Sequence, residues 1–117
     1  MMEAGRELDA IVAEKVMGLK VVRNKKGGWS IGPASWDDFA GEMIMSNPLP
    51  NYSGDIAVAW DVVEHLTKEK MFFHIQKRSF KYFEYYVFFG NAPSRTADTA
   101  PLAICLAALS YISGEEV

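Results

Sequence analysis

Two segments that lead from a polar loop into an apolar helical pattern contain residue types that could hold a ligand. They read "NYSGDIA" at 51–57 and "SRTADTAPLA" at 94–103. The first N–H groups of a helix have no partner within the helix, so a helix start can bind an anion. Because Asp55 and Asp98 already supply negative charge there, we expect a ligand that donates hydrogen bonds, such as a base, an amide or a ribose hydroxyl.

Aromatic and cationic side chains could complete this ligand site. Tyr52, Trp36 or Trp29 would stack on a base. Arg95 or Lys20 would contact a phosphate, and Asp55 would accept a hydrogen bond from the base or the ribose. The candidate ligand-binding residues are Trp29, Trp36, Asn51, Tyr52, Ser53, Asp55, Ser94, Arg95 and Thr96.

A purely structural interpretation of both segments stays open. Ser53 and Thr99 are residue types that commonly cap helices, because a side-chain oxygen can accept a hydrogen bond from an N–H of the first turn. In this interpretation the two segments only begin two well-capped helices. The two interpretations differ in whether these side chains are free to meet a ligand.

Residue types that perform catalysis or bind metals form no established signature. Asp37 and Asp38 are adjacent acids, which can transfer protons or hold Mg²⁺, but acids are also favoured in the first turn of a short helix. His65 and His74 have no neighbouring cysteine or carboxylate cluster. Cys105 lies within an apolar run, which predicts an inert buried thiol. We therefore expect no catalytic residues, no cofactor and no metal.

The composition indicates one globular domain over residues 1–117. Apolar residues make up 50% of the chain and charged residues 23%, as is usual for globular proteins. The net charge of −3 argues against binding to a nucleic acid polymer, which requires a basic surface. The single cysteine fits a reducing compartment. We find no signal peptide and no apolar run long enough to span a membrane.

Hydrophobic periodicity and turn residues predict the elements that must position these residues. The helix that follows the first polar loop is expected to bury a stripe made of Ile56, Ala59, Trp60, Val63 and Leu66, widened by Ala57, Val58 and Val62. The expected elements are a helix at 6–17, a hairpin at 19–32, a short helix before Pro48, a helix at 54–67, strands at 71–76 and 80–89, a loop from 90 to 100, and a helix at 101–113.

This order of elements predicts an α+β fold, a three-layer α/β/α sandwich. It would contain about four mostly antiparallel strands with helices on both faces of the sheet. The strand at 80–89 lacks polar alternation, which favours a sheet covered on both faces. No charged residue occurs from Thr99 to Ser113, so the last helix should be buried on more than one side, either in the domain or against another subunit.

Three segments of the chain resemble the recurring blocks of the phage ABA sandwich domain family. They are "ELDAIVAEKVMG" at 7–18, "PNYSGDIAVAWDVVEHL" at 50–66 and "DTAPLAICLAAL" at 98–109. Gly54 departs from the hydroxyl residue that is usual in the second block. The resemblance implies an α–β–α sandwich and a bacteriophage or prophage origin, and hence the cytoplasm of the bacterial host. It assigns no catalytic residues and leaves the activity open.

These observations favour a non-enzymatic, homo-oligomeric binding protein of a phage. One concrete version sequesters a nucleotide of host immune signalling, which would make the protein an anti-defence factor. The alternative is a protein–protein interaction module that acts on a host factor or on phage assembly. A small hydrolase that uses Asp37, Asp38 or Asp55 is the third possibility. We expect no nucleic acid polymer and no membrane among the partners.

Overall fold

A computed structural model of the chain describes residues 4–23, 29–31, 35–37, 42–44, 47–68, 71–78 and 84–113. The side chains at 22–23, 29–48 and 78 lie outside this description. The elements are α1 (Arg6–Ile11), the π-helical segment η1 (Val12–Val16), β1 (Val21–Arg23), β2 (Trp29–Ile31), β3 (Ser35–Asp37), β4 (Glu42–Ile44), β5 (Asn47–Pro48), α2 (Ile56–Thr67), β6 (Phe73–Arg78), β7 (Glu84–Phe89), β8 (Arg95–Ala97) and α3 (Ala100–Ser113).

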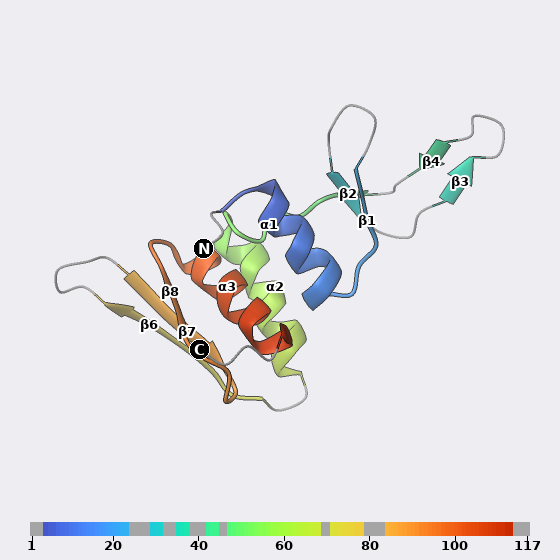
Figure 1. Ribbon diagram of the computed structural model, residues 1–117. Coiled ribbons are helices and arrows are strands. Elements are labelled where there is room, and N and C mark those ends of the chain that lie inside the picture. The colour runs from blue at the N-terminus through green and yellow to red at the C-terminus, as the bar shows by residue number, and fades with distance from the viewer. Residues whose placement is uncertain are drawn as a thin grey trace.

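The main sheet contains β6, β7 and β8 in that order, and both pairings are antiparallel. The three helices lie together on one side of this sheet (Figure 1). Strands β1, β2 and β5 form a second sheet, and β3 pairs with β4. Figure 1 shows β1 to β4 on the far side of the helices from the main sheet. The α+β class is confirmed, whereas a single four-stranded sheet between two helical layers is not confirmed.

Helix α3 lies at the centre of the fold. It packs against β7 and β8 on one side and against α2 and η1 on the other. Its residues from Ala103 to Ala108 are all buried, as the absence of charge predicts. Contact with another subunit is therefore not needed to explain the apolar sequence of this part of the helix.

The core joins the helical layer to the inner face of the sheet. Val87 and Phe89 of β7 are fully buried, because alternate residues of a strand point to the same face. They meet the buried side chains of α1, η1, α2 and α3 in one cluster. None of the described helices is long and apolar enough to cross a membrane.

The structure confirms one part of the stripe that α2 was predicted to bury and corrects another part. Ala59, Val62 and Val63 are buried, whereas Ile56 is 49% exposed and Trp60 is 44% exposed. Most residues of this helix are apolar, so hydrophobic periodicity alone does not determine which face is buried. The predicted and observed faces differ by about one residue, which is ~100° around a helix. The tertiary packing against α3 decides it.

Two further elements differ from the sequence predictions. Residues Ser35–Asp37 form strand β3 and not the start of a short helix, while Asp38 lies outside the described residues. The segment Arg95–Ala97, predicted to be loop, forms the edge strand β8. Both strands are only a few residues long, and tertiary pairing decides such short segments more than their own propensity.

Candidate functional site

The loop before α2 is fastened to the first turn of α1 by a buried carboxylate. Asp9 is fully buried, and Ser53 is nearly so. The Ser53 backbone N donates to Asp9 Oδ1 at 2.7 Å, and Ser53 Oγ donates to the same oxygen at 2.6 Å. Ser53 Oγ accepts in turn from the Gly5 backbone N at 2.9 Å. Ser53 therefore does not cap α2, as the sequence had suggested, but holds two segments together.

Arg6 completes this clasp, by which we mean Gly5, Arg6, Asp9, Leu49 and Ser53. Its Nη1 forms an ion pair with Asp9 Oδ2 at 2.9 Å. The Arg6 guanidinium also donates to the Leu49 carbonyl oxygen. A buried carboxylate is costly unless it is paired and hydrogen-bonded. Donors reach both oxygens of Asp9, so the clasp satisfies that requirement.

Tyr52 lies next to the clasp and points into the core. Its side chain is buried, and desolvation raises the pKa of its phenol, with smaller contributions from Asp61, Cys105 and Asp9. The ring therefore contributes apolar packing with a neutral hydroxyl. Because it is buried, it offers no face on which an external base could stack in this conformation.

Asp55 is the N-cap of α2. Its carboxylate Oδ1 accepts from the Ala57 backbone N at 2.9 Å, and its own backbone N donates to the Asn51 carbonyl oxygen at 3.0 Å. The exposed Asn51 side chain packs so closely on the turn that a Cβ at Gly54 would lie 2.6 Å from Asn51 Oδ1. The turn is therefore tight, and the departure at Gly54 suits it.

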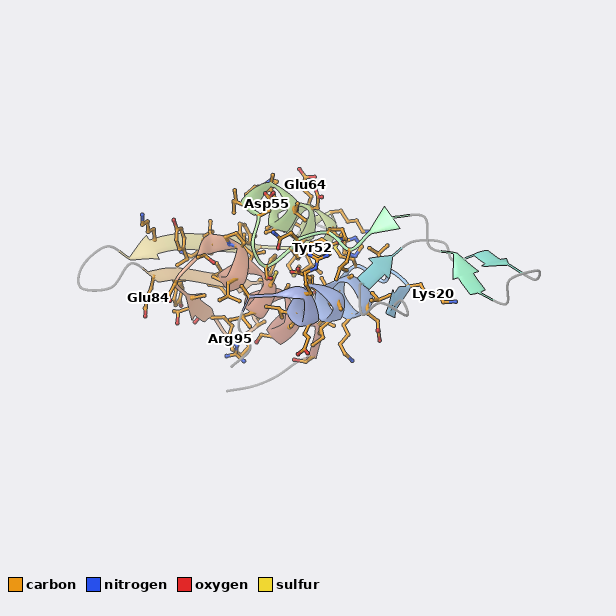
Figure 2. The ribbon with its side chains drawn as sticks, turned by 90° about the horizontal axis from the view of Figure 1, so that it is seen from above. Lys20, Tyr52, Asp55, Glu64, Glu84 and Arg95 are labelled. Atoms are coloured by element: carbon orange, nitrogen blue, oxygen red, sulfur yellow. The ribbon has the colours of Figure 1, made fainter. Side chains whose placement is uncertain are left out.

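The second helix start is also capped, as the structural interpretation predicts. Thr99 Oγ1 accepts from the Leu102 backbone N at 3.4 Å, and the Thr99 carbonyl oxygen accepts from the Ala103 N at 3.1 Å. Figure 2 places Asp55 and Arg95 on opposite sides of the helical layer, with Tyr52 between them. The two helix starts therefore do not present Asp55 and Arg95 to one ligand.

The remaining candidate residues are dispersed. Ser94 and Thr96 are partly buried at β8. Trp29 and Trp36 lie in β2 and β3, and their side chains are outside the described part of the structure. Within the described residues, no group of three His, Cys, Asp or Glu side chains is placed to hold a metal ion.

Cys105 is the buried thiol that the sequence predicts. Burial raises its pKa to about 12, and the negative charge of Asp9 adds to the shift. A thiol is nucleophilic only as its thiolate. At neutral pH Cys105 therefore acts as a small apolar residue of the core.

The outer face of the main sheet carries an aromatic cluster that our sequence analysis missed. The rings of His74 and Phe88 are stacked, with centroids 5.0 Å apart and planes 16° apart. Tyr86 meets both rings edge-on, at centroid distances of 6.2 Å and 6.1 Å. Gln76 Oε1 lies 3.5 Å from His74 Nε2. We call the outward residues His74, Gln76, Tyr86, Phe88 and Thr96 the aromatic face.

The aromatic face is the reverse side of the buried sheet. Strand β7 directs Val87 and Phe89 toward α3, whereas Tyr86 and Phe88 point away from the helices and are only partly buried. Alternation within "EYYVFF" could have suggested this division, but the apolar character of nearly every position concealed which residues point outward. The helices of the described structure cover only the inner face (Figure 1).

Comparisons with known proteins agree with the origin that the sequence blocks imply. The sequence profile of the phage ABA sandwich domain matches residues 10–109. The chain belongs to this family. All three blocks lie in the packed helices: Asp9 of the first bonds to Ser53 of the second, and α3 of the third packs on both.

One solved structure shows the same fold over the full chain. The crystal structure of a phage protein from Bacillus cereus ATCC 14579 is similar to this protein with a TM-score of 0.60 and 24% sequence identity. The similarity covers 100% of this chain and 95% of that one. No curated protein matches the sequence. The protein is thus a phage protein whose function the comparisons do not assign.

Proposed function

We propose that this phage protein is a non-enzymatic binding protein, that its ligand contains a nucleobase, and that the ligand stacks on the aromatic face. The stacked pair of His74 and Phe88, with planes 16° apart, carries the proposal. His74 is exposed on the outer strand β6, so a flat ring could pack on the solvent side of this pair. Stacking of a base on an aromatic side chain stabilises binding by about 1–3 kcal/mol.

The size of the aromatic face favours a small ligand over a protein. Strands β6 and β7 contain six residues each, which gives a length of about 20 Å. Three strands span about 10 Å across. A stable protein interface needs about 800 Å² per partner, several times more than this patch of sheet provides. A nucleotide fits within it.

Polar groups beside the rings support recognition of a base or sugar. Gln76 has both a donor and an acceptor and is exposed next to His74, while Thr96 adds a hydroxyl from β8. The helix start at 51–55 no longer supports the proposal, because Ser53, Tyr52 and Asp55 have structural roles there. In a phage protein, sequestration of a host immune-signalling nucleotide is the concrete form of this function.

Calorimetry with cyclic dinucleotides and cyclic ADP-ribose species tests the proposal. We expect saturable heat with at least one of them, loss of that heat in His74→Ala, and no change in the matched control His65→Ala on α2. Nucleotides recovered intact after denaturation of the complex would separate capture from hydrolysis. No heat and no shift of the melting temperature with any of these nucleotides would refute the proposal.

A protein–protein interaction module is the second candidate function. Large apolar side chains are exposed where β6 begins and α3 ends: Phe72 is 82% exposed, and Tyr111 and Ile112 are also exposed. The backbone N of Gly90 donates to Phe72 O, and a Cβ at Gly90 would lie 3.7 Å from the Tyr111 ring, so these segments are close. A pull-down from infected host lysate that recovers a stoichiometric partner, lost in Phe72→Ser, would favour this function.

A further inference from the structure

The open edge of the main sheet and the exposed side of α2 form one surface. Strand β6 pairs only with β7 among the described strands, so it is an edge strand. The Trp60 ring of α2 contacts the Phe73 ring of β6 edge-to-face, with centroids 5.7 Å apart. Figure 2 shows α2 and β6 on the same side of the molecule. We call this surface, which includes Ile56, Trp60, Phe73 and Ile75, the α2–β6 surface.

Hydrogen bonding fixes which backbone groups of β6 point to the open edge. The Gly90 backbone N donates to the Phe72 carbonyl oxygen at 2.7 Å, which makes these two residues a hydrogen-bonded pair. Such pairs alternate along an antiparallel ladder. His74 and Gln76 therefore also bond to β7. The residues between them direct their backbone N–H and C=O away from it.

This edge lacks two of the devices that usually protect edge strands, and only charge remains, at Lys77 and Arg78. Phe73 and Ile75 direct their backbone groups outward, and β6 pairs with β7 residue by residue without a bulge or a proline. Monomeric proteins commonly use bulges, prolines or charges to block further pairing. Directly beside the edge, Ile56 and Trp60 are exposed one helical turn apart. An open strand and an apolar helix stripe together are typical of a surface that is covered in the assembled protein.

We propose that a second copy of this chain covers the α2–β6 surface, with the two β6 strands paired antiparallel about a two-fold axis at Ile75. The occupant follows from the pairing rule. A residue whose backbone points outward must pair with another outward residue. The Gly90–Phe72 hydrogen bond extends the strand to Phe72, so centring the two strands on Ile75 gives the longest overlap with this parity. The contact is then isologous, as in most homodimers.

The side chains in this register are complementary. Lys77 comes opposite Phe73 of the partner subunit and so lies beneath its α2. That helix presents the exposed acid Glu64 one turn after Trp60, which gives the dimer opposite charges across its boundary. Ile56 and Trp60 add apolar area that strand pairing alone lacks. The main sheet continues from one copy into the other, and the two aromatic faces become neighbours.

Cross-linking tests the register directly. His74 faces Gln76 of the partner subunit as a non-hydrogen-bonded pair, whose Cα atoms are about 4.5 Å apart, within the range for a disulfide. We expect a mixture of His74→Cys and Gln76→Cys proteins to give covalent dimers on oxidation. Each variant alone should not, because identical positions lie farther apart. Cys105 does not interfere, since it is buried with a pKa raised to about 12.

Light scattering on the protein as it elutes from a size-exclusion column measures its mass and so tests the dimer itself. This test is independent of any nucleotide. The unmodified chain should have twice the monomer mass. Ile56→Asp, which places an acid where the helix dipole favours it, should raise the dimer dissociation constant at least about tenfold. Ala57→Asp in the same turn is the matched control. The proposal would be overturned if the unmodified chain stayed monomeric at concentrations on the order of 100 µM. It would also be overturned if each single variant cross-linked as fast as the mixture.

Discussion

Removal of the Asp9 carboxylate tests whether the clasp between α1 and the loop before α2 is a main source of stability. In Asp9→Ala, the backbone N and the hydroxyl of Ser53 lose a buried acceptor. Each orphaned buried donor costs about 1–3 kcal/mol. Arg6 is 45% exposed, so its guanidinium can return to water and adds little. We expect the free energy of unfolding to fall by about 3 kcal/mol.

A second variant separates the carboxylate from the hydroxyl. Ser53→Ala leaves Asp9 with the Ser53 backbone N and Arg6 as donors, so it should cost only about 1 kcal/mol. In Asp9→Ala the hydroxyl keeps only the Gly5 carbonyl oxygen, at 3.3 Å, as an acceptor, and in the double variant this hydroxyl is gone. The double variant should therefore be no less stable than Asp9→Ala alone, and the two effects should not add.

Urea unfolding followed by tryptophan fluorescence measures these differences. Glu7→Ala is the matched control, since Glu7 is an exposed acid in the same turn of α1 and should change stability by less than about 0.5 kcal/mol. A loss below about 0.5 kcal/mol in Asp9→Ala would refute the reasoning. So would additive losses in the double variant, because they would mean that Asp9 and Ser53 do not share one interaction.

Three further predictions concern the core and the turns. Because burial raises the pKa of Cys105 from 9.0 to about 12, the unfolded chain loses this proton first, and stability should fall between pH 9 and 12 by up to about 1.4 kcal/mol per pH unit. Cys105→Ala should reduce that slope in urea titrations at each pH. Gly90→Ala should cost about 1–2 kcal/mol by calorimetry, because Gly90 has a φ of 55° and Met71 lies 3.3 Å from the added Cβ; an unchanged melting temperature would contradict this. Val62→Ala should lower the free energy of unfolding by at least about 1 kcal/mol, whereas Trp60→Ala in the monomer should lower it clearly less. The reverse order in urea unfolding would mean that α2 buries the predicted face with Trp60.

The sequence predicts the buried centre of the fold better than its periphery. The uncharged stretch of α3 leaves it no stable place except between two layers, so its burial follows from composition alone. The rotation of α2 does not follow, because every residue from Ile56 to Trp60 is apolar and the acids of this helix begin only at Asp61. Strand β8 depends on pairing with β7, and only the folded sheet determines that pairing.

The candidate site shows a similar division. Asp55 and Thr99 act as helix caps, which residue type and position make predictable. Asp9 was missed because an acid in the first turn of a helix normally faces water and favours the helix dipole. Its partner, Ser53, lies 44 residues away, and no local pattern connects them. The aromatic face was missed because Tyr86 and Phe88 have the same apolar character as their buried neighbours Val87 and Phe89.

The clasp also has a consequence for how this chain could vary. Arg6 and Asp9 of α1 bond to Leu49 and Ser53. The segment between α1–η1 and Leu49 contains β1 to β5, and both of its ends are therefore held close to the same helix. Doubling the length of a closed flexible loop costs only about 0.6 kcal/mol of entropy. Leu19 and Val21 still pack against the core, so we expect a change of length to be tolerated only between Arg23 and Leu49, while the helices and the main sheet keep their arrangement.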